Sequence, residues 1–403
     1  MDRTRLHLQR LSGRAFLVQC AAAAVLLGGC GGGGDAGTPP FQGGTGSFAA
    51  GTITGFGSVI VNKVRFDDTH ATVTDDDGNA ASSSTLRLGM RVEIEGGAVH
   101  DDGSGPRCDA SAIRFGPEVV GPVESIDATA KSLVVLGQTV LVTDTTVIDD
   151  SLAGGFAAIA VGAVLDVHGT RDAATGAITA TRIEPKPAAA GFRLKGTIAS
   201  LDTTAKTFTI GAATISYANV AALPANLAND MPVKVRLQTT PVAGVWLATR
   251  LEAIHPHVGD ANEAEIEGTI TAFTSTASFS VNGIPVDASN ATFPDGTTGI
   301  VLGAHVEVHG TSSNGTVLAS RVEVVDHARR HAEGFELHGA ITAIDTTAQT
   351  FVLRGVTVAY GGAGVEFRNG TAAQLAVGVR VEARGTLSAD GTMLQATRIS
   401  FGD

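Results

Sequence analysis

Hydrophobic and polar residues alternate along short segments of this chain, most clearly near its C-terminal end. Between residues 339 and 399 the alternation predicts β-strands over 339–344, 351–353, 356–358, 378–385 and 394–399. The polar segment between the first two strands opens with Asp345 and predicts a turn, because an Asp side chain accepts hydrogen bonds from nearby backbone N–H groups. The segment 369–376, ahead of the fourth strand, has room for one helical turn.

The same succession of segments occurs five times. Each copy opens with Gly, one variable residue and an aliphatic residue. The opening glycines lie 70, 75, 72 and 71 residues apart. Each copy closes on Ala, a small polar residue, a variable position and an aliphatic residue, with Arg in the third place in four copies. Internal repeats of this length decide the architecture of a chain. The opening glycines are Gly51, Gly121, Gly196, Gly268 and Gly339.

Five short strands with a helical turn between the third and fourth are the order of an OB-like barrel. The sequence therefore predicts an all-β chain of five tandem small OB-like five-stranded barrels. Joints that contain Pro or charged residues, such as 185–187 and 326–330, are expected to hold neighbouring barrels at semi-fixed spacing in an elongated array. The expected repeats are residues 50–115, 119–184, 192–254, 263–325 and 334–401.

The N-terminal 29 residues have the pattern of a lipoprotein signal peptide. A basic segment with four arginines precedes an uncharged apolar run over 15–25, and Leu27-Gly28-Gly29-Cys30 follows as a lipobox. The apolar run is too short to span a membrane as a helix. We therefore expect lipidation at Cys30 and a Gly-rich tether over 30–49; an ordinary secretory signal with a chance cysteine is the alternative. Gly31, in place of an Asp, favours the outer membrane over the inner one.

A second glycine pattern in the tether is formally that of a dinucleotide-binding loop. Gly32, Gly34 and Gly37 have the required spacing, but no strand pattern precedes them and no helix pattern follows. A phosphate-binding loop requires both. The segment is therefore predicted to be a flexible tether.

Four motifs recur across the repeats: the Gly-x-Ile opening, Asp-Thr-Thr-Ala-x-Thr-Phe at 202–208 and 345–351, Gly-x-x-Val-Glu-Val-x-Gly at 303–310, and Ala-Thr-Arg-Ile at 180–183 and 396–399. Together they resemble the tandem OB-like domains of a family of bacterial lipoproteins whose function is undefined. The resemblance spans residues 50–401. It implies the fold and a location in the cell envelope, and it brings no catalytic residue.

Net charge and cysteine content exclude several classes of function. The chain has 28 Lys and Arg against 40 Asp and Glu. Without the signal peptide, which holds four Arg and one Asp, 24 remain against 39, a net charge of −15. Nucleic-acid phosphates require a basic face, so no nucleic-acid partner is expected. Cys108 is the one cysteine left besides Cys30, which excludes an internal disulfide and paired-thiolate metal sites.

Metal-binding residue types are present but do not form a recognised motif. His305 and His309 fall on one predicted strand, on the same face but far apart, and the other histidines considered flank linkers. A zinc or copper site is the open alternative. Solvated histidines are favoured, and no cofactor or metal is predicted. The linker histidines are His255, His257, His327, His331 and His338.

An acidic segment in the first repeat resembles half of a calcium-binding loop. Asp75, Asp77 and Asn79 match the first three alternate ligands of such a loop. Ala80 and Leu86, however, stand where the turning Gly and the closing Glu are needed. A polar hairpin loop is therefore predicted.

The repeated arginines of the closing strand are predicted to have a structural role. In three repeats an acid lies on the fourth strand, which forms a hairpin with the fifth, so acid and arginine are expected to pair across the strands and to contribute about 0.2–1 kcal/mol each. The predicted pairs are Asp166 with Arg182, Glu307 with Arg321, and Glu382 with Arg398.

Hydrolase, zinc-protease, dithiol and P-loop motifs are absent from the sequence, so no catalytic residue is assigned. The leading hypothesis is a non-enzymatic, membrane-anchored envelope lipoprotein that binds or spaces an unknown envelope protein, glycan or small ligand. One alternative is a small-ligand or glycan-binding protein that uses one diverged barrel, with Trp246 and Tyr217 of the third repeat as its aromatic groups. A metal-dependent or hydrolytic enzyme is the least favoured alternative.

Overall fold

The computed structural model describes residues 46–103, 105–326 and 334–402. The signal peptide, Cys30, His327 and His331 lie outside the described residues. Within them, no helix has both the length and the apolar character needed to cross a membrane. Within the described residues, the regular secondary structure is β-strand apart from three short 3₁₀ helices.

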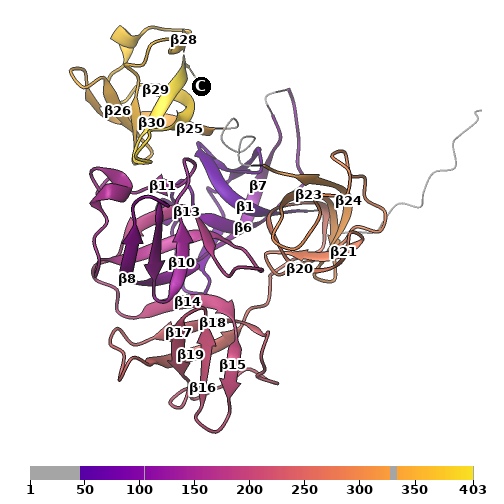
Figure 1. Ribbon diagram of the computed structural model, residues 1–403. Coiled ribbons are helices and arrows are strands. Elements are labelled where there is room, and N and C mark those ends of the chain that lie inside the picture. The colour runs from indigo at the N-terminus through magenta and orange to yellow at the C-terminus, as the bar shows by residue number, and fades with distance from the viewer. Residues whose placement is uncertain (1–45, 104, 327–333, 403) are drawn as a thin grey trace, which may run out of the picture. The chain divides into compact units, whose positions relative to one another are not determined.

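Repeat 2 shows the arrangement that all five repeats share (Figure 1). Its first strand pairs antiparallel with the second and fourth, the second pairs with the third, and the third pairs parallel with the fifth. The fourth and fifth strands then close the barrel as an antiparallel pair. This is the strand order of an OB-like barrel. The elements are β8 (Val119–Asp127), β9 (Ser132–Val135), β10 (Gln138–Leu141), β11 (Val147–Ile148), η2 (Gly155–Ala158), β12 (Val164–Arg171) and β13 (Ile178–Pro185).

The other four repeats have the same pairing, so the predicted fold class is confirmed. Repeat 1 consists of β1 (Ser47–Phe56), β2 (Val59–Val61), β3 (Val64–Asp67), β4 (Thr72–Asp75), β5 (Ala80–Ala81), η1 (Ser83–Thr85), β6 (Arg91–Gly96) and β7 (Arg107–Phe115). Repeat 3 consists of β14 (Phe192–Thr197), β15 (Ala199–Asp202), β16 (Thr207–Ile210), β17 (Ala213–Ser216), β18 (Pro232–Leu237) and β19 (Trp246–Ala253).

Repeats 4 and 5 complete the chain. Repeat 4 consists of β20 (Ala261–Ser275), β21 (Ser278–Val281), β22 (Ile284–Asp287), β23 (His305–Ser313) and β24 (Thr316–Val324). Repeat 5 consists of β25 (Phe335–Asp345), β26 (Thr350–Leu353), β27 (Val356–Ala359), β28 (Glu366–Arg368), η3 (Ala372–Gln374), β29 (Arg380–Leu387) and β30 (Leu394–Phe401). The 3₁₀ helices of repeats 1, 2 and 5 occupy the predicted place between the third and fourth strands.

The recurring Asp turn forms as its sequence predicts. In repeat 5, the Asp345 carboxylate accepts hydrogen bonds from the backbone N–H groups of Thr347 and Ala348, both at 2.9 Å. Asp127 and Asp202 accept the equivalent pairs in repeats 2 and 3. These side chains replace backbone partners within the turn and so fix the first hairpin of repeats 2, 3 and 5.

The recurring place of a glycine within the fourth strand of repeats 4 and 5 is explained by a β-bulge. In repeat 4 the register shifts between His309 and Gly310, and a Cβ on Gly310 would lie 2.0 Å from the carbonyl oxygen of Leu318. No side chain fits at that distance, because the bulged strand presses against its partner. Gly385 occupies the same place in repeat 5, with the same 2.0 Å approach to a backbone oxygen.

Strand β1 serves two barrels at once. Inside repeat 1, its residues 47–52 pair with β6, and Ile53 and Gly55 pair with β2. On their other edge, Ser47–Ala50 also pair in parallel with Glu263–Ile266 of repeat 4. Side chains alternate accordingly, with Ala49 in the hydrophobic core of repeat 1 and Phe48 and Ala50 in that of repeat 4. The tether predicted over 30–49 is therefore wrong at its end, since residues 47–49 belong to β1.

Strand pairing and core packing also join other repeats. β1 pairs with β25 of repeat 5 at Gly55 and Phe56, and β8 of repeat 2 pairs with β14 of repeat 3. The hydrophobic core clusters follow these pairings, because one contains repeats 1 and 5 and another contains repeats 2 and 3. The expected elongated array, in which barrels meet only at linkers, is wrong for the described residues. Each barrel is small and exposes edge strands, and pairing those edges across repeats satisfies their backbone groups.

Replacing Phe48 with Ala should loosen repeat 4, although Phe48 belongs to the first strand of repeat 1. Phe48 is 1% exposed and packs in the core cluster of repeat 4, so the lost contacts and the cavity should cost about 3–5 kcal/mol. Hydrogen exchange of the β20–β24 amides measures this. Phe208→Ala, inside repeat 3, is the matched control and should leave these amides protected. A Phe48→Ala chain that loses protection only in repeat 1 would contradict the shared strand.

Candidate functional site

The outer surface of the first and fourth strands carries a different set of charges in each repeat. Four residues form it, two on each strand, and they lie opposite one another in the antiparallel register; we name this set the cross-strand face. In repeat 3 the opposed residues are Arg193 with Arg236 and Lys195 with Lys234. In repeat 4 they are Glu265 with His309 and Glu267 with Glu307, and in repeat 5 they are Glu336 with Arg384 and His338 with Glu382.

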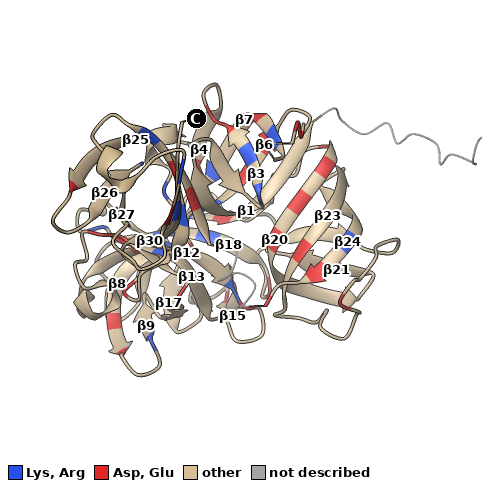
Figure 2. Cartoon of the chain, turned by 90° about the horizontal axis from the view of Figure 1, so that it is seen from above, with Lys and Arg blue, Asp and Glu red and all other residues tan. Residues whose placement is uncertain are grey.

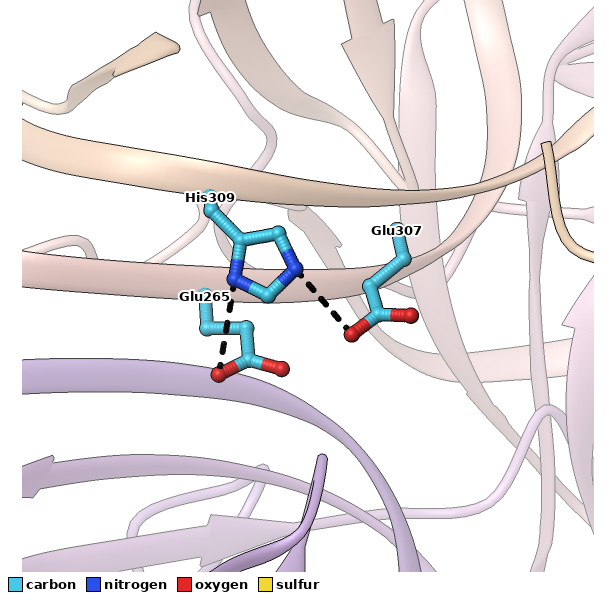
Figure 3. Close-up of side chains that lie close together, drawn as sticks. All are labelled: Glu265, Glu307 and His309. Atoms are coloured by element: carbon cyan, nitrogen blue, oxygen red, sulfur yellow. Dashed lines mark ion pairs between the residues drawn. The ribbon is translucent and has the colours of Figure 1, made fainter. Parts of the chain in front are cut away.

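The cross-strand face of repeat 4 brings two carboxylates and an imidazole together (Figure 3). The His309 ring lies between the two glutamates, with Nε2 3.1 Å from Glu307 Oε1 and Nδ1 3.8 Å from Glu265 Oε2. One ligand atom from each residue lies within 4.8 Å of the others. The Glu307 side chain is 9% exposed, that of Glu265 18% and that of His309 36%, so the group opens to solvent on the histidine side.

The two carboxylates shift each other's pKa in opposite directions. Burial, followed by the hydrogen bond and the charge of Glu307, raises the pKa of Glu265 to about 9. The hydrogen bond from His309 is the largest cause that lowers the pKa of Glu307 to about 2, and the positive charge of Lys63 adds to it. Two carboxylates this close disfavour each other's ionisation.

Acidic residues continue along the same surface. Figure 2 shows Asp and Glu positions, coloured red, along β20 and β23. Glu267, beside the cluster, lies 2.9 Å from Nε2 of His305. Lys63, from the turn between β2 and β3, and Asn62, whose side-chain amide donates to the Glu265 carbonyl at 3.1 Å, come from repeat 1. The face is therefore acidic and lies against repeat 1.

The equivalent group of repeat 5 is closed by arginines. Glu336 and Glu382 occupy the places of Glu265 and Glu307, but Arg384 stands where repeat 4 has His309. A nitrogen of Arg384 lies 3.0 Å from Glu336, which also forms ion pairs with Arg65 of repeat 1 and with His338. Although burial raises the pKa of Glu336, the hydrogen bond from His338 and the two arginines lower it overall.

The cross-strand face of repeat 3 is wholly cationic and is covered by an acidic turn. The turn between β4 and β5 of repeat 1 carries Asp75, Asp76 and Asp77. Asp77, whose side chain is 4% exposed, pairs with Arg193 at 3.0 Å, with Lys234 at 3.7 Å and with Arg236. The remaining close ion pairs are Asp75 with Arg193 at 3.3 Å, Asp76 with Arg193 at 3.1 Å and Asp76 with Lys195 at 2.9 Å.

The hydrogen bonds of this turn show what the segment that resembles half of a calcium-binding loop forms. Asp75 accepts hydrogen bonds from the backbone N–H groups of Asp77 and Asn79, and from the Asn79 side-chain amide. Its outward carboxylates face cations of repeat 3. The segment is a polar hairpin turn, as predicted, and its acidic residues form an interface between repeats.

Repeat 2 buries a histidine on its cross-strand face. His168 on β12 is 1% exposed, and its Nε2 lies 3.5 Å from Oδ1 of Asp166. Burial lowers the pKa of His168 to about 3, so the ring is neutral at pH 7. Burial likewise raises the pKa of Asp166, although Lys186, 3.3 Å away, opposes that shift.

The predicted cross-strand acid–arginine pairs do not form. Arg182 binds Asp149 at 2.6 Å and Glu184 at 2.9 Å, while Asp166 binds Lys186. Arg321 pairs with Glu323 and Glu307 with His309; Arg398 pairs with Glu366 at 2.9 Å, and Glu382 with Arg384. The reason is the register, which places Arg398 opposite Arg384 and Glu382 opposite Ser400.

The sequence does contain a signal for the pairs that form. In repeats 2, 3 and 4 a glutamate follows the arginine two residues later, on the same side of the strand. These residues pair as Arg182 with Glu184, Arg250 with Glu252 and Arg321 with Glu323. In these three repeats the ion pair thus joins residues two apart on one strand, whereas Arg398 of repeat 5 pairs with Glu366 on the neighbouring strand β28.

The aromatic residues considered for a ligand site in repeat 3 pack inside it. Tyr217 is 5% exposed and stacks on Phe208 with ring centroids 5.9 Å apart. Trp246 packs edge-on against Phe192 at 5.6 Å and contacts the core cluster of repeats 2 and 3. Neither ring forms an exposed stacking surface.

Comparison with known proteins gives one family. The model of a domain of unknown function, DUF5666, matches residues 50–104, 120–184, 267–323 and 338–400, together more than half of the chain. None of these segments covers repeat 3, whose fourth strand also lacks the flanking glycines. No curated protein matches. A solved structure, drosophila Unr CSD456, is similar at 13% identity and a TM-score of 0.14 over 52% of this chain and 96% of that one.

Asp77→Asn should destabilise the contact between repeats 1 and 3. The change leaves the cations of repeat 3 without their most buried carboxylate, and we expect a loss of about 2–3 kcal/mol, less than for a fully buried pair because the cations stay partly hydrated. Urea unfolding measures it. Asp102→Asn, which removes the exposed partner of Arg107, should change stability by less than about 0.5 kcal/mol. Equal effects of the two changes would contradict the buried contact.

His168 should make the fold sensitive to mild acid. Between pH 6.5 and about pH 3 the unfolded chain binds a proton at this residue that the folded chain does not, so stability falls as pH falls, by up to about 1.4 kcal/mol per pH unit. Urea unfolding from pH 6.5 to 5 should show a shallower slope for His168→Gln than for the unchanged chain. His255→Gln, at an exposed position, should keep the full slope. Parallel slopes for all three would contradict a buried neutral ring.

Proposed function

The chain belongs to the DUF5666 family of domains of unknown function, and we propose that it is a lipid-anchored protein of the bacterial cell envelope that binds or spaces other molecules without catalysing a reaction. Its anchor is a lipid on Cys30, and its location is the outer membrane. The Gly-rich segment after Cys30 joins the anchor to the barrels.

The observation that carries this proposal is the sharing of strand β1 between repeats 1 and 4. Barrels of this size are marginally stable alone, and a shared strand together with complementary charged faces links them into one unit. A protein that binds or spaces needs such fixed contacts between its domains. An enzyme needs a reactive group held ready in an open site.

Among the described residues, the thiol of Cys108 and the cationic face of repeat 3 both have structural roles. Cys108 is 7% exposed, its Sγ lies 3.4 Å from the Ser47 hydroxyl, and burial raises the pKa of its thiol, which makes it a poor nucleophile. Three carboxylates cover the cationic face of repeat 3. With a net charge of −15 after signal removal, this covered face supports a partner other than nucleic acid.

Lipidation at Cys30 is the test of this proposal. Mass spectrometry of the mature N-terminus should find diacylglycerol and an acyl chain on Cys30, and the chain should fractionate with membranes. Cys30→Ser should release it into the soluble fraction, because a single cysteine carries all of the acyl chains. Cys20→Ser, within the segment expected to be removed, is the matched control and should not change fractionation. A cleaved, unacylated and soluble wild-type chain would overturn the anchor.

A further inference from the structure

We propose that Glu265, Glu307 and His309 of repeat 4 bind a divalent transition-metal ion, with Zn²⁺ as the best fit. This site is independent of the lipid anchor, and it gives one of the five barrels a ligand that its neighbours do not take. The inference rests on the donor set, on the charge of the face and on a comparison with repeat 5.

The donor set suits zinc. Two carboxylate oxygens and one imidazole nitrogen, each within 4.8 Å of the others, are the ligand types and the number that a zinc site with an open position uses. Imidazole nitrogen favours first-row transition ions over Ca²⁺, which takes six to eight oxygen ligands. Thiolate ligands play no part, since Cys108 is buried in the core cluster of repeat 1.

The arrangement of charges leaves a place for a cation. The His309 ring lies between the two carboxylates, with Nε2 3.1 Å from Glu307 and Nδ1 3.8 Å from Glu265. One donor atom of each of the three residues lies within 4.8 Å of the others, so a single cation placed between them is within reach of all three. A metal ion bound to one nitrogen and to both carboxylates satisfies all three residues at once.

Repeats 1 and 4 both contribute charged groups around the site. Glu267, which lies 2.9 Å from Nε2 of His305, extends it on repeat 4, and Lys63 of repeat 1 acts on both Glu265 and Glu307. Glu265, Glu267 and Glu307 make this face acidic. A divalent ion offsets their negative charge.

Repeat 5 explains why only one barrel takes the metal. It holds the equivalent Glu336 and Glu382, with His338 beside them, so its ligand types are the same. Arg384, however, occupies the position of His309, and Arg65 reaches Glu336 from repeat 1. A guanidinium donates hydrogen bonds but cannot bind a metal, so the two arginines fill the site that His309 leaves open in repeat 4.

The test is titration of the full chain with Zn²⁺ in metal-free buffer, together with X-ray absorption at the zinc edge. We expect one strongly bound Zn²⁺ with nitrogen and oxygen ligands at about 2.0–2.2 Å and no sulfur. His309→Gln should weaken zinc binding by about tenfold or more, and so should Glu265→Gln. His338→Gln, the matched change in repeat 5, should leave the affinity unchanged.

A variant that binds zinc more tightly distinguishes a change at the site from a loss of folding. Lys63→Gln removes the ammonium charge that faces the two carboxylates, so it should strengthen zinc binding, which an unfolded repeat would not do. Circular dichroism of each variant reports whether the barrels remain folded. Zinc affinity that is equal in the unchanged chain, His309→Gln and Lys63→Gln would overturn the proposal. A zinc spectrum without an imidazole ligand would do the same.

Discussion

The structure depends on one strand being used twice. Residues 47–50 of β1 pair with β6 of repeat 1 on one edge and with β20 of repeat 4 on the other. Because side chains alternate along a strand, Phe48 and Ala50 enter one core while Ala49 enters the other. The two barrels therefore cannot separate without exposing a large aromatic side chain and breaking a row of backbone hydrogen bonds. This link also brings the turn after β2 against the acidic face of repeat 4, where Lys63 acts on Glu265 and Glu307.

The repeats share a frame and differ on one surface. Inward positions keep the alternation of aliphatic residues that closes each barrel. The Asp turn recurs because its carboxylate accepts backbone hydrogen bonds, and the bulge glycine recurs because a side chain would not fit there. The four positions of the cross-strand face are free of that requirement. In repeat 3 they became four cations, in repeat 4 three acids and a histidine, and in repeat 5 two acids, a histidine and an arginine. Charge complementarity on these faces then selects which repeats meet.

Repeat 3 shows how a charged cross-strand face determines the role of a segment from a neighbouring repeat. The aspartates of the β4–β5 turn look like part of a calcium loop when only their spacing is considered. Opposite Arg193, Lys234 and Arg236 they are the counter-charges of another barrel. A partly buried cluster of four cations would be costly if it stood alone, and the acidic turn offsets that cost.

The sequence by itself determined the properties that depend on neighbours along the chain. Alternation gave the strands, the Asp-Thr-Thr turn gave the hairpins, and five copies of one order gave five OB-like barrels, because strand periodicity and turn chemistry are local. It could not show that Phe48 fills the core of a repeat more than 200 positions away, or that His309 meets Glu265 and Glu307. Those contacts were decided by the tertiary structure, since strand register, the bulges and the pairing of repeats set which outward side chains meet. The failed pairing of Glu382 with Arg398 has the same cause, because the register of the two strands places each residue opposite a different partner.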